Sequence, residues 1–163
     1  MVRTAIITSS DSGYRGERED VSGKTIQKIL EAQGYQVVSM TLLPDEQQML
    51  SDKMKEIADQ GEADLILTTG GTGFSPRDCM PEATRAVVER EVPGIPEAMR
   101  AYSLQFTKRA MLSRAAAGIR KSTLIVNLPG SPKAVGECLT FILSELEHGI
   151  EILTGTATNC ARK

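Results

Sequence analysis

The sequence predicts an α/β fold, with a single three-layer domain in which a mostly parallel sheet is flanked by helices. Three observations predict this class. The chain has 163 residues, a length that suits one domain of ordinary size. Short apolar runs alternate with amphipathic stretches, as in a sheet whose crossover connections are helices. The run Ala63–Thr69 (ADLILTT) is apolar on both faces, as expected of a strand inside a parallel sheet.

The N-terminal part of the chain is expected to hold a strand, a loop and a helix. Arg3–Ser9 (RTAIITS) has the composition of a short buried strand, and the polar, glycine-containing stretch Asp11–Asp20 predicts a loop. We expect a helix over Ser22–Gln33 because Ser22 can cap it, its large apolar residues share one face, and Gly34 can end it.

A second strand and a second helix should follow. Tyr35–Leu43 is rich in strand-forming residues, and Pro44 stops it. Asp45 and Gln48 have the spacing of a capping box, with Asp in place of Ser or Thr, so Asp45 is expected to cap a helix that runs to about Gln60. A cap at the carboxyl end of a strand can still face a ligand.

The middle of the chain predicts a glycine-containing loop and two helices. Gly70–Asp78 (GGTGFSPRD) follows the strand at Ala63–Thr69 and is expected to be a loop. Pro81 suits the first turn of the next helix, which should end before the Val-Pro pair at 92–93. A further helix is expected from about Pro96 through Phe106.

The C-terminal part contains one ambiguous segment. Three alanines in Ser113–Arg120 favour a helix, whereas its glycine and the polar pair after it suit a hairpin. We favour a β-hairpin near residues 113–128 that ends in the strand Thr123–Leu128. The last helix is expected over Ala134–Leu153, where Gly149 can break it in two. Residues 1–155 should then form the domain, and residues 156–163 a frayed C-terminal tail.

Charge and composition exclude several classes of function. The formal net charge is −2, and 4% of the residues are aromatic, with no Trp. Broad electrostatic binding to nucleic acid needs clustered positive charge, and single-stranded nucleic acid needs aromatic platforms. We therefore expect no nucleic-acid partner.

The cysteines and the N-terminus indicate a cytoplasmic protein. The three cysteines are far apart and include no CxxC motif, which argues against a structural zinc site and a disulfide framework. The apolar stretch near the N-terminus is too short for a signal-peptide core or a membrane span. We expect reduced thiols, a cytoplasmic location and no membrane association.

Polar residues and glycines follow four of the predicted strands. Ligands of parallel sheets bind beyond the carboxyl ends of the strands, so these residues should meet at one edge. They are Ser9, Ser10, Asp11 and Ser12, then Asp45, then Gly70–Gly73 and Asp78, and finally Gly130, Ser131 and Lys133. The glycine loop can cradle phosphate with its backbone N–H groups, or it can be no more than a tight strand-to-helix turn. It is neither a Walker A loop nor a GxGxxG motif.

The two aspartates near this edge allow two interpretations. Asp78 can bind Mg²⁺, or it can cap a helix or pair with Arg77; Asp45 can bind Mg²⁺ or cap a helix. Magnesium sites use one or two carboxylates with water and substrate phosphates. The single histidine, His148, argues against Cys–His and Ser–His–Asp catalysis. The residues alone therefore predict an α/β domain that binds a phosphorylated small molecule with Mg²⁺.

Four segments in order resemble the molybdopterin adenylyltransferase family, the MogA/MoaB group that includes the gephyrin G domain. They are LLPDEQ (Leu42–Gln47), TTGGTGFSPRD (Thr68–Asp78), VPGIPEAMR (Val92–Arg100) and LSRAAAGIRKSTLIVNLPGSPKAV (Leu112–Val135). Glu19–Gly23 is also similar to the family's early acidic loop. The resemblance covers nearly the whole chain.

The resemblance implies an activity and a set of site residues. It implies that Mg²⁺-dependent transfer of AMP from ATP to molybdopterin releases pyrophosphate, within molybdenum cofactor biosynthesis. Asp45 and Asp78 match the family's catalytic, metal-binding aspartates. The substrate-binding residues that it implies are Asp11, Ser12, Gly70, Gly71, Thr72, Gly73, Ser75, Pro129, Gly130, Ser131 and Lys133.

The same resemblance implies partners and leaves alternatives. It implies a homotrimer and a partner protein that inserts molybdate into the product. The alternatives are a molybdopterin-binding paralogue or trimeric scaffold without catalysis, and a nucleotide-binding regulatory domain of the competence-damage type. Retention of both aspartates, Asp45 and Asp78, favours the enzyme.

Overall fold

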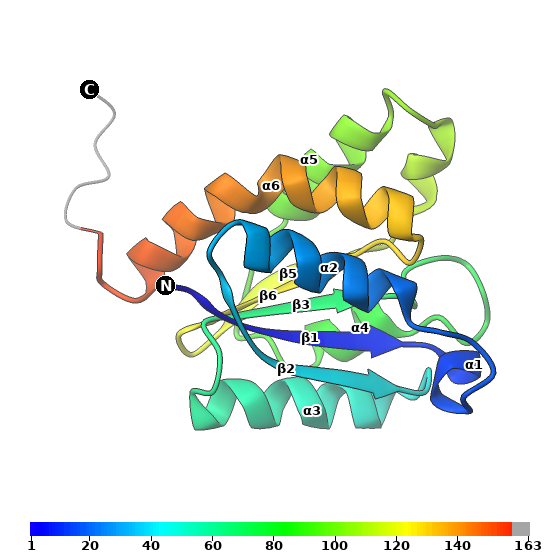
Figure 1. Cartoon of the computed structure of the whole chain (residues 1–163), viewed down its shortest axis with the longest axis horizontal. Coiled ribbons are helices and arrows are strands. Elements are labelled where there is room, and N and C mark those ends of the chain that lie inside the picture. Colours follow the sequence, from blue (N-terminus) through cyan, green and yellow to red (C-terminus); the bar gives the residue numbers. More distant parts are fainter. Residues whose placement is uncertain (158–163) are drawn as a thin grey trace.

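Six strands form one sheet in the order β2-β1-β3-β6-β5-β4, as seen in the computed structural model, which describes residues 1–157 (Figure 1). The strands are β1 (Arg3–Ser9), β2 (Gln36–Leu43), β3 (Leu65–Thr69), β4 (Arg90–Glu91), β5 (Ala117–Arg120) and β6 (Thr123–Leu128). β2, β1, β3 and β6 are parallel neighbours, whereas β5 runs antiparallel to β6, and β4 runs antiparallel to β5. The predicted mostly parallel sheet and the hairpin are confirmed.

Helices cover both faces of the sheet. They are α1 (Asp11–Tyr14), α2 (Val21–Ala32), α3 (Gln47–Gln60), α4 (Met80–Arg85), α5 (Gly94–Ser103), the 3₁₀ helix η1 (Lys108–Leu112) and α6 (Pro132–Leu153). In Figure 1, α2, α5 and α6 lie on one face, and α3 and α4 lie on the other. None of the helices in the described residues is long and apolar enough to cross a membrane.

Two hydrophobic cores, one on each face, hold the layers together. Side chains alternate along β1, so that Ile6 packs under α2 and α6 while Ile7 packs under α3 and α4. Leu67 of β3 joins the first core and Ile66 the second. Each fully buried side chain of this kind contributes about 1.5–3 kcal/mol to folding. The cores fix the strands, and the strands in turn fix the positions of the loops that follow them.

Several predicted boundaries and caps are wrong. Asp20, not Ser22, caps α2, because its Oδ1 accepts from the Gly23 N–H (2.8 Å). Asp45 does not cap α3, which begins at Gln47 after an extended Glu46 with no side-chain cap. Gly149 does not break α6, whose last turns stay in contact with the first core through Ile150.

The differences in the loops are local. The stretch predicted as a loop over 11–20 contains the short helix α1, and α5 ends at Ser103 rather than Phe106. Neither η1 nor the two-residue β4 is expected from the sequence pattern. Cys79 and Cys138 form no disulfide in the described part of the chain. Cys160 and most of the predicted tail lie outside the described residues.

Candidate functional site

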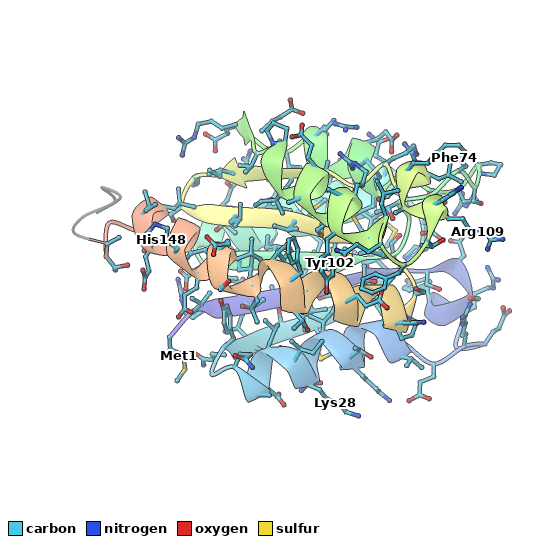
Figure 2. All side chains as sticks on the ribbon, turned by 90° about the horizontal axis from the view of Figure 1, so that it is seen from above. Met1, Lys28, Phe74, Tyr102, Arg109 and His148 are labelled. Atoms are coloured by element: carbon cyan, nitrogen blue, oxygen red, sulfur yellow. The ribbon has the colours of Figure 1, made fainter. Side chains whose placement is uncertain are left out.

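The predicted site residues meet where β1, β2, β3 and β6 end, at the right-hand edge in Figure 1. Asp11 and Ser12 follow β1, Asp45 follows β2, the glycine loop follows β3, and Pro129–Lys133 follows β6. The parallel topology brings these four segments together, although they are far apart in sequence. His148 lies at the opposite end of the molecule from Phe74 and Arg109 (Figure 2), so the only histidine is remote from this edge.

Asp45 is held by the loop that follows β1. Ser9 Oγ donates to Asp45 Oδ1 (2.5 Å), and the Asp11 N–H donates to Asp45 Oδ2 (3.1 Å). The Asp45 N–H in turn donates to Asp11 Oδ1 (2.9 Å). These contacts outcompete the local cap predicted from the sequence. They direct the carboxylate towards the end of β1 and leave each of its oxygens a further lone pair.

The glycine loop begins with two residues in the left-handed backbone region. Gly70 has φ +89° and Gly71 has φ +71°. A Cβ on Gly70 would lie 2.3 Å from the Ser9 carbonyl oxygen, so only glycine lets the ends of β1 and β3 approach this closely. The backbone of this loop is therefore uncovered at the centre of the edge.

Asp78 folds back onto the same loop. Its Oδ2 accepts from the Ser75 N–H (3.0 Å) and would lie 2.9 Å from a Cβ placed on Gly73. Within residues 1–157, its Oδ1 receives no hydrogen bond. Of the alternatives for Asp78, pairing with Arg77 is not seen, because Arg77 binds Asp11 instead.

A partly buried arginine that we did not predict, Arg114, also holds the glycine loop. Arg114 Nε donates to the Gly73 carbonyl (2.7 Å), and Arg114 Nη2 donates to the Asp78 carbonyl (3.0 Å). The Arg114 N–H donates to the Thr72 carbonyl (2.9 Å), and the guanidinium also pairs with Glu82. The sequence signal for Arg114 is its place in the segment LSRAAAGIR, directly before the hairpin.

The loop after β6 closes the edge on the other side. Ser131 caps α6 by accepting from the Ala134 N–H (3.3 Å). Thr69 Oγ1 donates to the Pro129 carbonyl (2.6 Å), and Ser22 Oγ donates to the Gly130 carbonyl (2.7 Å). Lys133 is exposed on the first turn of α6. Both peptide carbonyls before the cap are thus fixed.

A polar cavity of about 440 Å³ opens between this loop and the loop after β1. Its walls include hydroxyl groups, one arginine and two acidic side chains, contributed by Thr8, Ser9, Ser10, Arg18, Glu19, Asp20, Ser22, Gly70, Gly130 and Ser131. Asp20 was not among the predicted site residues. It accepts from Thr8 Oγ1 (2.7 Å) and from the Gly23 N–H in the first turn of α2 (2.8 Å), and both donors hold its carboxylate at the cavity wall.

A second cavity of about 400 Å³ lies under α5, η1 and the start of α6. It is lined mainly by apolar groups with two arginines, and the lining includes Thr72, Gly73, Phe74, Met99, Arg100, Arg109, Ser113, Pro129 and Cys138. Burial raises the pKa of the Cys138 thiol, and the hydrogen bond with Ser103 opposes that shift. Gly70 and Gly130 line the polar cavity, whereas Gly73 and Pro129 line the second one. The two loops therefore form the wall between the cavities.

The carboxylates at this edge fit an ion that a substrate helps to hold. No cluster of three or more His, Cys, Asp or Glu side chains suited to a metal occurs within residues 1–157. Mg²⁺ does not need such a cage, since one or two carboxylates with phosphate and water oxygens complete its octahedron. Asp78 Oδ1 and the remaining lone pairs of Asp45 supply oxygen donors of this kind.

Fold and site together define an α/β domain with a glycine loop and two carboxylates at the carboxyl edge of a parallel sheet, the edge at which such sheets bind their ligands. Residues 5–148 match the family model described as "Probable molybdopterin binding domain". The chain belongs to this family of molybdopterin-binding domains.

Similar proteins agree with this assignment. The chain is 36% identical over 156 residues to a molybdopterin adenylyltransferase of Helicobacter pylori, which covers 94% of this chain and 89% of that protein. It superimposes on the molybdopterin biosynthesis enzyme MoaB of Thermus thermophilus with a TM-score of 0.90 and 47% identity, over 95% of this chain and 98% of that one. The tungsten cofactor synthesizing protein MoaB of Pyrococcus furiosus superimposes with a TM-score of 0.83 and 34% identity, over 93% of this chain and 96% of that one.

Proposed function

We propose that this protein is a molybdopterin adenylyltransferase that joins AMP from ATP to molybdopterin and releases pyrophosphate, within molybdenum cofactor biosynthesis. One observation carries the proposal. Two cavities lie on either side of a shared wall made by the glycine loop and Pro129–Gly130. An enzyme that joins two molecules needs two such adjoining sites, with the reacting atoms meeting at the wall. The named relatives support the same reaction.

Charge assigns a substrate to each cavity. The polar cavity carries Glu19 and Asp20 against the single cation Arg18, and its carboxylates suit the hydroxyl groups of a ribose. The second cavity carries Arg100 and Arg109 against the single anion Glu137, and its guanidinium groups suit a molecule that bears a phosphate and two thiolates. We therefore assign the adenosine of ATP to the polar cavity and molybdopterin to the second cavity. Ser131 lines the polar cavity, so we assign it to the nucleotide rather than to the pterin.

The reaction is one displacement at phosphorus. A phosphate oxygen of molybdopterin forms a bond to the α-phosphorus of ATP, and the bond from that phosphorus to the bridging oxygen breaks, so pyrophosphate leaves with the electron pair. The backbone N–H groups of Gly70–Gly73 hold phosphate oxygens between the cavities. Asp45 and Asp78 would hold Mg²⁺, which neutralises charge on the phosphates when it is bound. Positioning by the protein supplies the rest of the acceleration.

The test is to measure pyrophosphate release from Mg-ATP with and without molybdopterin, and to identify the pterin product by mass. We expect pyrophosphate only in the presence of molybdopterin, together with adenylyl-molybdopterin. Tight molybdopterin binding without this product would favour a binding paralogue or scaffold. ATP binding with no affinity for the pterin would favour a regulatory nucleotide-binding domain.

The proposal extends to the setting of the reaction. It includes the homotrimer, a cytoplasmic location, and delivery of the product to a partner protein that inserts molybdate. Light scattering on the purified protein should give three chain masses, and a monomer would contradict the trimer.

A further inference from the structure

Arg77 links three of the loops that form the carboxyl edge. It lies in the glycine loop, and its Nε and Nη2 atoms donate to Asp11 Oδ2 (3.0 Å) and Oδ1 (3.1 Å). Nη2 also donates to Glu46 Oε1 (2.9 Å). The hydrogen bonds from Arg77, followed by the one from the Asp45 N–H, lower the pKa of Asp11. One guanidinium thus joins the loops after β1, β2 and β3.

Arg77 connects to both proposed metal-binding carboxylates, Asp45 and Asp78, through one intervening residue or through the chain itself. Asp11 exchanges two hydrogen bonds with Asp45, at 2.9 and 3.1 Å, and Glu46 is the chain neighbour of Asp45. Arg77 itself is the chain neighbour of Asp78. Asp45 is hydrogen-bonded to Ser9 and Asp11. Within residues 1–157, Arg77 is the only side chain of the glycine loop that donates a hydrogen bond to either of these two residues.

We propose that Arg77 is a positioning residue that sets the separation of the Asp45 and Asp78 carboxylates. The inference rests on the proposed function. The fold does not need this contact, because Arg114 already holds the glycine loop through the Gly73 and Asp78 carbonyls. The Arg77 side chain is 52% exposed, and exposed ion pairs add little to stability. A small displacement of reacting groups, in contrast, lowers rate strongly.

Because the ion pairs of Arg77 are exposed to solvent, their effect on kcat should depend on the salt concentration. The Debye length falls from about 10 Å at 0.1 M salt to about 3 Å at 1 M, so salt weakens an exposed pair. At saturating substrates, kcat of the wild type should therefore fall with added salt more steeply than kcat of Arg77→Ala, which has no pair to lose.

The kinetic experiment compares Arg77→Ala and Arg77→Lys with Arg85→Ala. Arg85 is a matched control, since its side chain is also 52% exposed and pairs with a glutamate, Glu91 of the edge strand β4, which is not among the residues of the carboxyl edge. We expect Arg77→Ala to lower kcat about ten- to a hundredfold with an unchanged Tm and an unchanged KM for molybdopterin. Arg77→Lys should have a higher kcat than Arg77→Ala but a lower one than the wild type. It keeps the positive charge but cannot make the paired hydrogen bonds of a guanidinium group. Arg85→Ala should match the wild type.

A double-mutant cycle tests the coupling. Once Arg77 is replaced by Ala, Glu46→Gln should cause no further loss of kcat, whereas alone it should cause a partial loss. Wild-type kcat in Arg77→Ala would overturn the proposal, as would a loss explained by a lower folded fraction. A raised KM for ATP at unchanged kcat would also overturn it, because Arg77 would then bind the nucleotide directly.

A structural measurement separates this inference from the proposed reaction. Crystal structures of the wild type and Arg77→Ala, grown in one condition, give the separation of the two carboxylates without reference to activity. A wider separation in the variant supports the inference even if the wild type forms no adenylyl product, and an equal separation overturns it.

Discussion

The two ends of the parallel strands use the same arginine–carboxylate chemistry for different purposes. At the amino end, Asp64 accepts three hydrogen bonds from Arg3, at 2.7 to 3.2 Å, and Asp59 accepts from Arg120 Nε (2.8 Å) and Nη2 (2.9 Å). At the carboxyl end, Arg77 binds Asp11 and Glu46 but leaves the carboxylates of Asp45 and Asp78 free of any cation in the described residues.

The difference shows how to tell a structural pair from a site. An arginine pairs with each carboxylate at the amino end, so the fold itself neutralises their negative charge. Burial by itself raises the pKa of Asp64, and the hydrogen bonds from Arg3 outweigh it, so the pKa lies below its ordinary value. At the carboxyl end, the oxygens of Asp45 and Asp78 keep spare lone pairs, and the glycine loop beside them lines both cavities. Carboxylates that have no cationic partner and lie close to a cavity are the feature that indicates a functional site.

The largest expected effect comes from exchanging one carboxylate at each end. Asp78→Asn should lower kcat on the order of a hundredfold or more, because a metal-binding oxygen is lost, with little change in stability. Asp64→Asn should leave kcat unchanged and lower the free energy of unfolding by roughly 1 kcal/mol. The measurements are steady-state pyrophosphate release and urea denaturation. A near wild-type rate in Asp78→Asn would remove Asp78 from the mechanism.

A smaller effect is expected from Gly70, which needs its left-handed backbone. Gly70→Ala places a Cβ against the Ser9 carbonyl and should cost about 1–3 kcal/mol of stability, together with part of the activity. Gly136 in α6 is the control, since a Cβ there meets no atom within 4 Å. Gly136→Ala should stabilise the protein by about 0.5–1 kcal/mol. Urea denaturation of both variants provides the test, and equal stabilities would refute the strain argument.

The smallest effect concerns Asp59 and its dependence on pH. Hydrogen bonds from Arg120 lower the pKa of Asp59 from 3.8 to about 2. Because the folded pKa lies below the unfolded one, the contribution to stability is present above about pH 4 and is lost as the pH falls towards 2. Asp59→Asn should therefore be less stable than the wild type at pH 5 and equal to it near pH 2, by thermal unfolding. A constant difference would mean that the charge is not responsible.

Elements buried on both faces could be predicted from sequence alone. Arg3–Ser9 and Thr123–Leu128 have the predicted bounds, because an apolar run with polar flanks determines a central strand. The Ser131 cap was also predictable, since its partner is three residues away. The convergence of the strand ends followed from the parallel topology, and it placed Asp45 and the glycine loop at one edge.

Contacts between remote segments could not be predicted. Asp45 has the local spacing of a cap, but Ser9 and Asp11 compete for it from 36 and 34 residues away. Arg77 turns from its neighbour Asp78 to Asp11, 66 residues distant. Arg114 escaped notice for the same reason, because its hydrogen bond to Gly73 spans 41 residues. Asp20 was noted only as part of the segment Glu19–Gly23, and its contact with Thr8 comes from 12 residues away.

The parallel pairing of the central strands also has a kinetic consequence. Thr8 pairs with Thr69, and Thr69 with Leu128, so each pairing closes roughly sixty residues of chain before it gains any contact. The loops that follow β3 and β6 line both cavities, so neither cavity is complete until these strands have paired. Refolding should therefore be slow for a chain of this length, and ligand affinity should return only in the last step. An intermediate with native-like helices but unpaired β6 would expose the cores on both faces and would be the species most prone to aggregate.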